Sequence, residues 1–155
     1  MGLDFSTREV DSQPMVGIRV TAKITELGQI MGPLFGEVMG HIQRSGQHPA
    51  GMPFAIYHGM DGGEVDVECG IPVGSPIESE GRVKAGELPA GTVATVTHMG
   101  HYEGLRETWA ALTGWMSSQG LAPAAAPWEV YVTDPGAEPD PSKWRTEIFF
   151  PVRQS

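Results

Sequence analysis

The sequence is poor in cysteine, with Cys69 as the single example among 155 residues. A lone cysteine cannot form an internal disulfide, so the fold must be stabilised by its apolar core. A chain of this length can bury roughly two-thirds of its unfolded surface, which is enough for such a core. Low cysteine usage suits a reducing compartment, and we therefore expect a cytoplasmic protein.

Basic residues are also scarce, because 10 Lys and Arg face 19 Asp and Glu, for a net charge of −9. A domain that binds duplex DNA needs a basic patch, so we expect no direct nucleic-acid partner. No apolar run approaches the length of a bilayer span, which argues against a membrane partner. Residues 1–10 carry Asp4 and Glu9 and lack the apolar stretch of a signal peptide.

Common sequence motifs of catalytic, nucleotide-binding and cofactor-binding sites are missing as well. The sequence contains no G-x-S-x-G element, no P-loop and no dinucleotide fingerprint. The five histidines do not show the spacing of a metal site, although His98 and His101 flank a glycine. We therefore expect neither a cofactor nor a bound metal.

An internal repeat is the clearest positive feature. Three pairs of segments match in the same order: Val20-Thr21 with Val96-Thr97, PFAIY (53–57) with PWEVY (127–131), and ECGIPV (68–73) with EIFFPV (147–152). Matches in one order, with offsets that differ only by loop lengths, indicate a duplicated unit. We predict two halves, about 15–74 and 91–152, that pack as a pseudo-two-fold pair within a single domain spanning 1–155.

Each half has the pattern of a β-α-β-β unit. Strands alternate apolar and polar residues, and each helix repeats apolar residues at three- and four-residue steps. The first half has strands at 15–22, 53–59 and 64–73 and a helix ending near Gly46; the second has strands at 91–98, 127–133 and 144–152 and a helix ending near Gly120. The fold class is therefore α+β, with antiparallel sheets, two main helices packed on the outer faces and a central ligand cleft.

Two features of the first helix call for explanation. Pro33 is tolerated in the first turn of a helix, where its missing N–H costs nothing, so we place it there. Glycines recur every fourth residue at Gly28, Gly32, Gly36 and Gly40. We expect this row to let the helix backbone approach the sheet closely.

Strand alternation identifies the candidate ligand-binding residues. Trp128 and Val130 share one face of their strand, which we assign to the helix side, so Glu129 and Tyr131 are expected on the opposite face. The same reasoning applied to the other strands gives the full set on the non-helix face: Tyr57, Glu68, Glu129, Tyr131, Glu147 and Phe149.

Carboxylates beside aromatic rings suit an organic cation, because rings attract cationic charge and a poorly solvated carboxylate supplies a counter-ion. The alternative is an ordinary solvated sheet face with scattered acids. Glu68 and Glu147 could instead pair with a sheet neighbour such as Arg19. A partly desolvated Glu129 should also oppose folding, so Glu129→Gln is expected to stabilise the free protein.

Several separated segments resemble the GyrI-like family of small-molecule-binding domains. They are WEVYVTDPGAEPDPSKWRTEIFFPV, EVDVECGIPV, LPAGTVATVTHMGHYEGL and the helix ending in GWM, and they span nearly the whole chain. The resemblance implies a duplicated β-α-β-β fold, related to the effector-binding domains of MerR- and AraC-type multidrug-responsive activators. It also implies that Glu129 is the pocket carboxylate that meets cationic drugs and that Tyr131 is its companion aromatic residue.

The segment 98–102 sits where relatives carry a His-x-Gly-Pro-Tyr pattern, with His101 in place of the proline. The resemblance therefore adds His98 and Tyr102 to the candidate ligand-binding residues, at the mouth of the pocket. The alternative for this segment is a simple strand-to-helix turn.

Three functions follow from the resemblance. The first is a stand-alone protein that sequesters or senses small amphipathic, cationic molecules, with any regulatory output through a separate partner because the module starts almost at residue 1. The second is a hydrolase of reactive cyclopropane-type electrophiles, with Glu129 and Tyr131 as candidate catalytic residues. The third is a protein-interaction module, as in family members that inhibit DNA gyrase. We rank them in that order.

Overall fold

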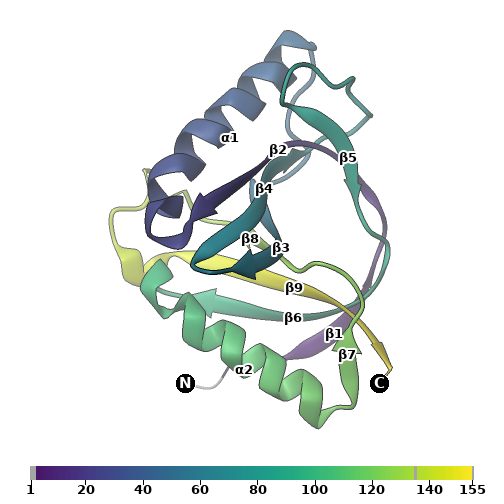
Figure 1. The fold of residues 1–155 in the computed structure, drawn as a ribbon, viewed down its shortest axis with the longest axis vertical. Coiled ribbons are helices and arrows are strands. Elements are labelled where there is room, and N and C mark those ends of the chain that lie inside the picture. Colours follow the sequence, from purple (N-terminus) through teal and green to yellow (C-terminus); the bar gives the residue numbers. More distant parts are fainter. Residues whose placement is uncertain (1–2, 135, 155) are drawn as a thin grey trace. The chain divides into compact units, whose positions relative to one another are not determined.

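The computed structural model describes residues 3–134 and 136–154 (Figure 1). The chain forms two compact units. The first unit comprises residues 11–90, and the second comprises residues 91–154 together with the N-terminal residues up to Val10. Within the described residues, no helix is long and apolar enough to cross a membrane.

The first unit is an antiparallel sheet with one long helix. Its elements are β2 (Gln13–Lys23), a short 3-10 helix η1 (Ile24–Glu26), α1 (Leu27–Arg44), β3 (Phe54–Asp61), β4 (Glu64–Pro72) and β5 (Lys84–Leu88). The strands lie in the order β3-β4-β2-β5. Helix α1 packs against β2 and β4 and buries Leu34, Val38 and Ile42.

The second unit repeats this plan. Its elements are β1 (Ser6–Val10), β6 (Gly91–Met99), η2 (Tyr102–Gly104), α2 (Leu105–Ser118), β7 (Leu121–Pro123), β8 (Trp128–Tyr131), η3 (Pro141–Lys143) and β9 (Arg145–Gln154). The strands lie in the order β1-β6-β9-β8, and β7 pairs with the end of β9. All pairings are antiparallel.

The predicted repeat is confirmed in the order of the elements. Strands and helices follow as β2-α1-β3-β4 in one half and β6-α2-β8-β9 in the other. The matched segments 53–57 and 127–131 fall on β3 and β8, and each of these strands pairs with the strand that follows it. The fold is therefore the predicted α+β duplication.

An exchange of short strands was not predicted. Two residues connect β1 to β2, and two residues connect β5 to β6. Yet β1 pairs with β6, and β5 pairs with β2. Each short strand therefore pairs with the first strand of the more distant repeat and not with the strand that follows it in sequence. Hydrophobic alternation could not predict this exchange, because it identifies a strand but not the strand with which it pairs.

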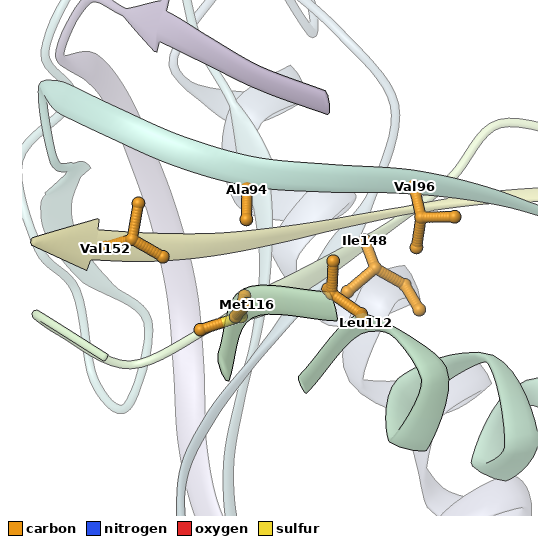
Figure 2. Close-up of a cluster of buried hydrophobic side chains, with 6 residues drawn as sticks. All are labelled: Ala94, Val96, Leu112, Met116, Ile148 and Val152. Atoms are coloured by element: carbon orange, nitrogen blue, oxygen red, sulfur yellow. The ribbon is translucent and has the colours of Figure 1, made fainter. Parts of the chain in front are cut away.

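The core of the second unit lies between α2 and its sheet. Leu112 and Met116 of α2 face Ala94 and Val96 of β6 and Ile148 and Val152 of β9 (Figure 2). Leu112 and Met116 are four residues apart and so lie on one helix face. This packing determines which face of the sheet α2 covers, and therefore which side chains of β8 lie beneath the helix.

Both expectations for the first helix are wrong. Helix α1 begins at Leu27 after a 3-10 turn, so Pro33 lies beyond the first turn and interrupts the backbone hydrogen-bond ladder. A Cβ atom at Gly28, Gly32 or Gly36 would meet nothing within 4 Å. The glycine row therefore faces away from the sheet, and no close backbone approach explains it.

A close approach occurs instead in the sheet. A Cβ atom at Gly70 of β4 would lie 2.7 Å from Cζ of Phe54 and 2.8 Å from Cε of Met15, both of which are buried. Its neighbour Cys69 is fully buried, and burial raises the pKa of the Cys69 thiol to about 12. Cys69 therefore stays protonated at neutral pH and serves as core packing, as its place on the apolar face predicted.

Candidate functional site

The face on which Glu129 lies differs from the sequence expectation. In the register of β8 with β9, Glu129 is opposite Ile148, and Ile148 belongs to the core beneath α2. Glu129 and Tyr131 therefore lie on the α2 side of the sheet. Trp128 lies on the other side, where its ring stacks on Phe149 with the centroids 5.6 Å apart.

The alternation along β8 was correct, but the assignment of faces was wrong. The most apolar residue of the strand was placed against the helix, whereas Trp128 packs on the opposite surface. As a result the residues that were predicted to share one face of the sheet are divided between its two faces. Glu129 and Tyr131 lie on one side of their sheet, and Glu147 and Phe149 lie on the other.

Glu129 is a buried carboxylate held by two side chains, with 3% of its surface exposed. The indole Nε1 of Trp109 on α2 donates a hydrogen bond to Oε1 at 2.5 Å. The hydroxyl of Tyr131 donates to Oε2 at 2.7 Å. Both donors are neutral groups, and together they orient the carboxylate.

Helix packing explains why Trp109 reaches this position. Trp109, Leu112 and Met116 recur at three- and four-residue steps on α2. Leu112 and Met116 pack over β6 and β9, and the ring of Trp109 meets Phe150 of β9 edge-on at 6.1 Å. The indole therefore lies over the sheet, where its N–H needs a hydrogen-bond partner and finds Glu129.

An aromatic cluster, formed by His101, Tyr102, Tyr131 and Trp144, adjoins the carboxylate. The ring of Tyr102 meets that of Tyr131 edge-on at 5.9 Å and that of Trp144 at 5.1 Å. The imidazole of His101 stacks on Trp144 at 5.4 Å. A continuous row of rings therefore runs from the half-buried Tyr131 to the exposed His101.

Local backbone contacts position this cluster. Gly100 has a φ of 116°, in the region that favours glycine, and it turns the chain from β6 into η2. Its N–H donates to the carbonyl of Trp144 at 2.8 Å, while the indole Nε1 of Trp144 donates to the carbonyl of Glu138 at 2.8 Å. The start of η2 and the segment before β9 are thus joined at the cluster.

Electrostatics make this region favourable for positive charge. Burial raises the pKa of the Tyr102 phenol, and the negative charges of Asp134 and Glu129 raise it further. Tyr102 is therefore a neutral hydrogen-bond donor at neutral pH, surrounded by acidic potential. Glu129 and the aromatic cluster together combine a buried carboxylate with several ring surfaces.

His98 connects the strand, the turn and the helix of the second unit. It is 7% exposed, its Nδ1 lies 2.7 Å from Oγ1 of Thr108, and its Nε2 lies 2.9 Å from the carbonyl of His101. A carbonyl only accepts, so Nε2 carries the hydrogen, and in the neutral ring Nδ1 accepts from Thr108. These bonds match the strand-to-helix turn that was the alternative for this segment.

Glu147 and Phe149 have contacts of their own on the other side of the sheet. Nη2 of Arg145 lies 3.3 Å from Oε2 of Glu147. The guanidinium of Arg8 lies over the ring of Phe149, 5.1 Å from its centroid. The Phe149 ring therefore already has a cation from β1 over it.

Tyr57 and Glu68 belong to the first unit. Tyr57 is opposite Val67 in the register of β3 with β4, the place in the repeat that Tyr131 holds in the second unit. Glu68 accepts from Nε2 of His58 at 2.8 Å, when that nitrogen carries the hydrogen. Arg19, expected as a partner for Glu68, instead donates two hydrogen bonds to Asp66.

Two members of the site were missed by the sequence reasoning, Trp109 and Trp144, whereas His101 was noted only as the residue in place of the family's proline. Trp109 falls at one of the apolar steps of the second helix, and an indole N–H at a half-buried position signals a polar partner. Within the described residues, no group of three or more metal-ligating side chains occurs.

Comparison with known families agrees with this geometry. A sequence model of the GyrI-like small molecule binding domain matches residues 3–153. The chain belongs to the GyrI-like family. Among curated proteins, no sequence match was found.

Solved structures show the same GyrI-like fold in EcmrR, a protein that was solved in a complex with DNA. The C-terminal domain of EcmrR is similar over 100% of both chains, with a TM-score of 0.83 and 25% identity. EcmrR in its complex with DNA is similar with a TM-score of 0.87 and 24% identity, over 99% of this chain and 58% of EcmrR. The GyrI-like domain described here therefore spans little more than half the length of that protein.

More distant structures share the fold alone. A hydrolase from Listeria innocua is similar with a TM-score of 0.66 and 14% identity, over 96% of this chain and 91% of that one. SAV2435, solved bound to tetraphenylphosphonium, has a TM-score of 0.63 and 14% identity, over 97% and 94% of the two chains. GyrI-like architecture thus occurs in proteins named for different activities.

Proposed function

We propose that this GyrI-like domain binds small amphipathic organic cations at Glu129 and the aromatic cluster, and so sequesters or senses them. The observation that carries the proposal is the buried carboxylate of Glu129, held by two neutral donors beside the ring of Tyr131. Such a carboxylate supplies negative charge in a region of low dielectric, where it attracts a cation more strongly than in water.

The cluster supplies the second part of the recognition. A cation within about 6 Å of an aromatic centroid is attracted by the ring, most strongly where water is excluded. Tyr102, Tyr131 and Trp144 present half-buried rings, and Tyr102 lies within the field of Glu129 and Asp134. Ring contacts suit a lipophilic cation that has no N–H to donate, as in the tetraphenylphosphonium bound to SAV2435.

The test is calorimetric titration of the protein with tetraphenylphosphonium. Removing one member of a desolvated charge pair costs about 2–5 kcal/mol, so Glu129→Gln should weaken binding by that amount. Glu147→Gln is the matched control, because Glu147 lies on the other side of the sheet. Equal affinities for the wild type and Glu129→Gln, or no binding by the folded wild type, would refute the proposal.

Counter-ion and shape contributions can be separated with a second ligand pair. A phenylalkyl trimethylammonium and its uncharged tert-butyl analogue have the same shape. Glu129→Gln should weaken the first and leave the second nearly unchanged. Equal losses for both ligands would mean that the substitution damages the site in general.

A hydrolase is the second candidate, favoured by the 2.7 Å hydrogen bond from Tyr131 to Glu129. Water would attack a strained ring carbon while a ring carbon–carbon bond breaks. Glu129 would take the proton of the water, Tyr131 would protonate the released group, and the proton on Glu129 would return to Tyr131 along the hydrogen bond. Turnover of a cyclopropane electrophile that is lost in both Glu129→Gln and Tyr131→Phe would favour this candidate over simple binding.

A further inference from the structure

The first unit has a cavity of its own, far in sequence from Glu129. It measures about 400 Å³, within the range of small-molecule sites, and lies where the C-terminal end of α1 meets residues 76–80. Its lining includes His41, Arg44, Glu78 and Glu80, all within the first unit.

His41 is the unusual member of this lining, because its side chain is only 5% exposed. Its Nε2 lies 2.8 Å from the carbonyl of Glu78. A carbonyl only accepts, so Nε2 carries the hydrogen, and in the neutral ring Nδ1 is an acceptor. Among the described residues, this buried Nδ1 has no hydrogen-bond partner. Buried polar atoms are nearly always paired, so Nδ1 calls for a donor.

A second acceptor lies beside it. Oε2 of Glu80 is 3.7 Å from Nδ1 of His41, too far for a hydrogen bond between them. One nitrogen at about 2.8 Å from each atom would reach both. The cavity is lined by one basic residue, Arg44, and two acidic residues, Glu78 and Glu80, and the C-terminal end of α1 adds partial negative charge. The net negative charge of the lining favours a positively charged donor.

We propose that this cavity binds the primary ammonium group of a small organic amine, with one N–H donated to Nδ1 of His41 and another to Oε2 of Glu80. The site differs from the one at Glu129 in what it recognises. A primary ammonium is required here, because a quaternary ammonium has no N–H to give to the imidazole.

The test is a titration with n-butylammonium, followed by the ¹⁵N signals of the His41 ring in the labelled protein. Binding should shift the Nδ1 signal, and butyltrimethylammonium should leave it unchanged. Glu80 is 69% exposed and solvent screens its attraction for the ammonium, so Glu80→Gln should weaken the binding of n-butylammonium by up to about fivefold. Because the side chain is exposed, this substitution also leaves the core intact.

Glu64→Gln is the matched control, since Glu64 is an exposed acid at the start of β4 and outside the lining. Glu129→Gln should show the same shift of the His41 Nδ1 signal with n-butylammonium as the wild type, which separates this site from the proposed function. Three results would overturn the inference: no shift of the His41 Nδ1 signal at saturating n-butylammonium, an equal shift of that signal with butyltrimethylammonium, or equal n-butylammonium affinities at His41 for Glu80→Gln and Glu64→Gln. A doubly protonated His41 ring in the free protein at neutral pH would also overturn the inference, because His41 and Glu80 would then form a simple ion pair with no acceptor left on the ring.

Discussion

Replacing Glu129 with glutamine should destabilise the folded protein. The carboxylate accepts from Trp109 through one oxygen and from Tyr131 through the other. A glutamine side chain keeps one acceptor oxygen and places an NH₂ group at the second position. One of the two donors then faces another donor, and the group left unsatisfied in a buried site costs about 1–3 kcal/mol.

This result has the opposite sign to the expectation from the sequence. A desolvated carboxylate without donors opposes folding, and its removal would stabilise the protein. The two hydrogen bonds change that balance, because they compensate the carboxylate for the loss of water. They also tie β8 to α2, since Trp109 belongs to the helix.

Urea denaturation of the ligand-free protein at neutral pH measures the effect, with Glu147→Gln as the control. We expect the control to change the free energy of unfolding by less than about 1 kcal/mol, because Glu147 is partly exposed and its contact with Arg145 is a surface ion pair. Thermal melts should agree, because 1 kcal/mol corresponds to about 2–4 °C in a protein of this size. A Glu129→Gln variant as stable as the wild type, or more stable, would refute the reasoning.

A double-mutant cycle assigns the energy to a particular bond. Tyr131→Phe removes only the hydroxyl that donates to Glu129, and it should cost about 1.5–3 kcal/mol in the wild type. In the Glu129→Gln background the same change should cost clearly less, because the charged acceptor is gone. Equal costs in both backgrounds would mean that the hydroxyl contributes through some other contact.

Three further predictions concern the rest of the fold. Thr108→Val keeps the shape of the side chain but leaves Nδ1 of His98 without its donor, so urea denaturation should show a loss of about 1–3 kcal/mol; a loss below about 0.5 kcal/mol would contradict the bond. The pKa of Tyr102 is raised in the folded state, so the contribution of Tyr102 to stability is complete below the ordinary pKa of 10.0 and is lost as pH rises through the folded-state pKa. The free energy of unfolding between pH 8 and 11 should therefore fall more steeply for the wild type than for Tyr102→Phe. Gly70→Ala should reduce stability by about 1–3 kcal/mol through overpacking. Gly114→Ala, in open space on α2, should raise stability by up to about 1 kcal/mol. Similar melting temperatures for the two variants would contradict the close approach at Gly70.

Most of the fold could be predicted from local patterns. The alternation in residues 15–22 and 91–98 marked β2 and β6, and the three- and four-residue steps after Leu27 and Leu105 marked the two helices. The paired motifs PFAIY and PWEVY identified the repeat. These signals are readable because side-chain periodicity is fixed by the geometry of each element.

The candidate site was only partly predictable. Glu129, Tyr131 and Tyr102 were identified from the strand pattern and the family resemblance, and the structure brings these three together in the second unit. Trp109 and Trp144 were missed, because they come from a helix and a loop remote in sequence from β8. Contacts between such elements depend on how they pack, which no local pattern records.

The sequence by itself determined the order of elements within each β-α-β-β unit, the duplication and the alternation of side chains along the predicted strands. Only the tertiary structure decided the pairing of β1 with β6 and β5 with β2, and the face of β8 that α2 covers. Alternation divides a strand into two faces but does not say which one meets a helix. In β8 the packing of Leu112 and Met116 made that choice, and it placed Glu129 beneath Trp109.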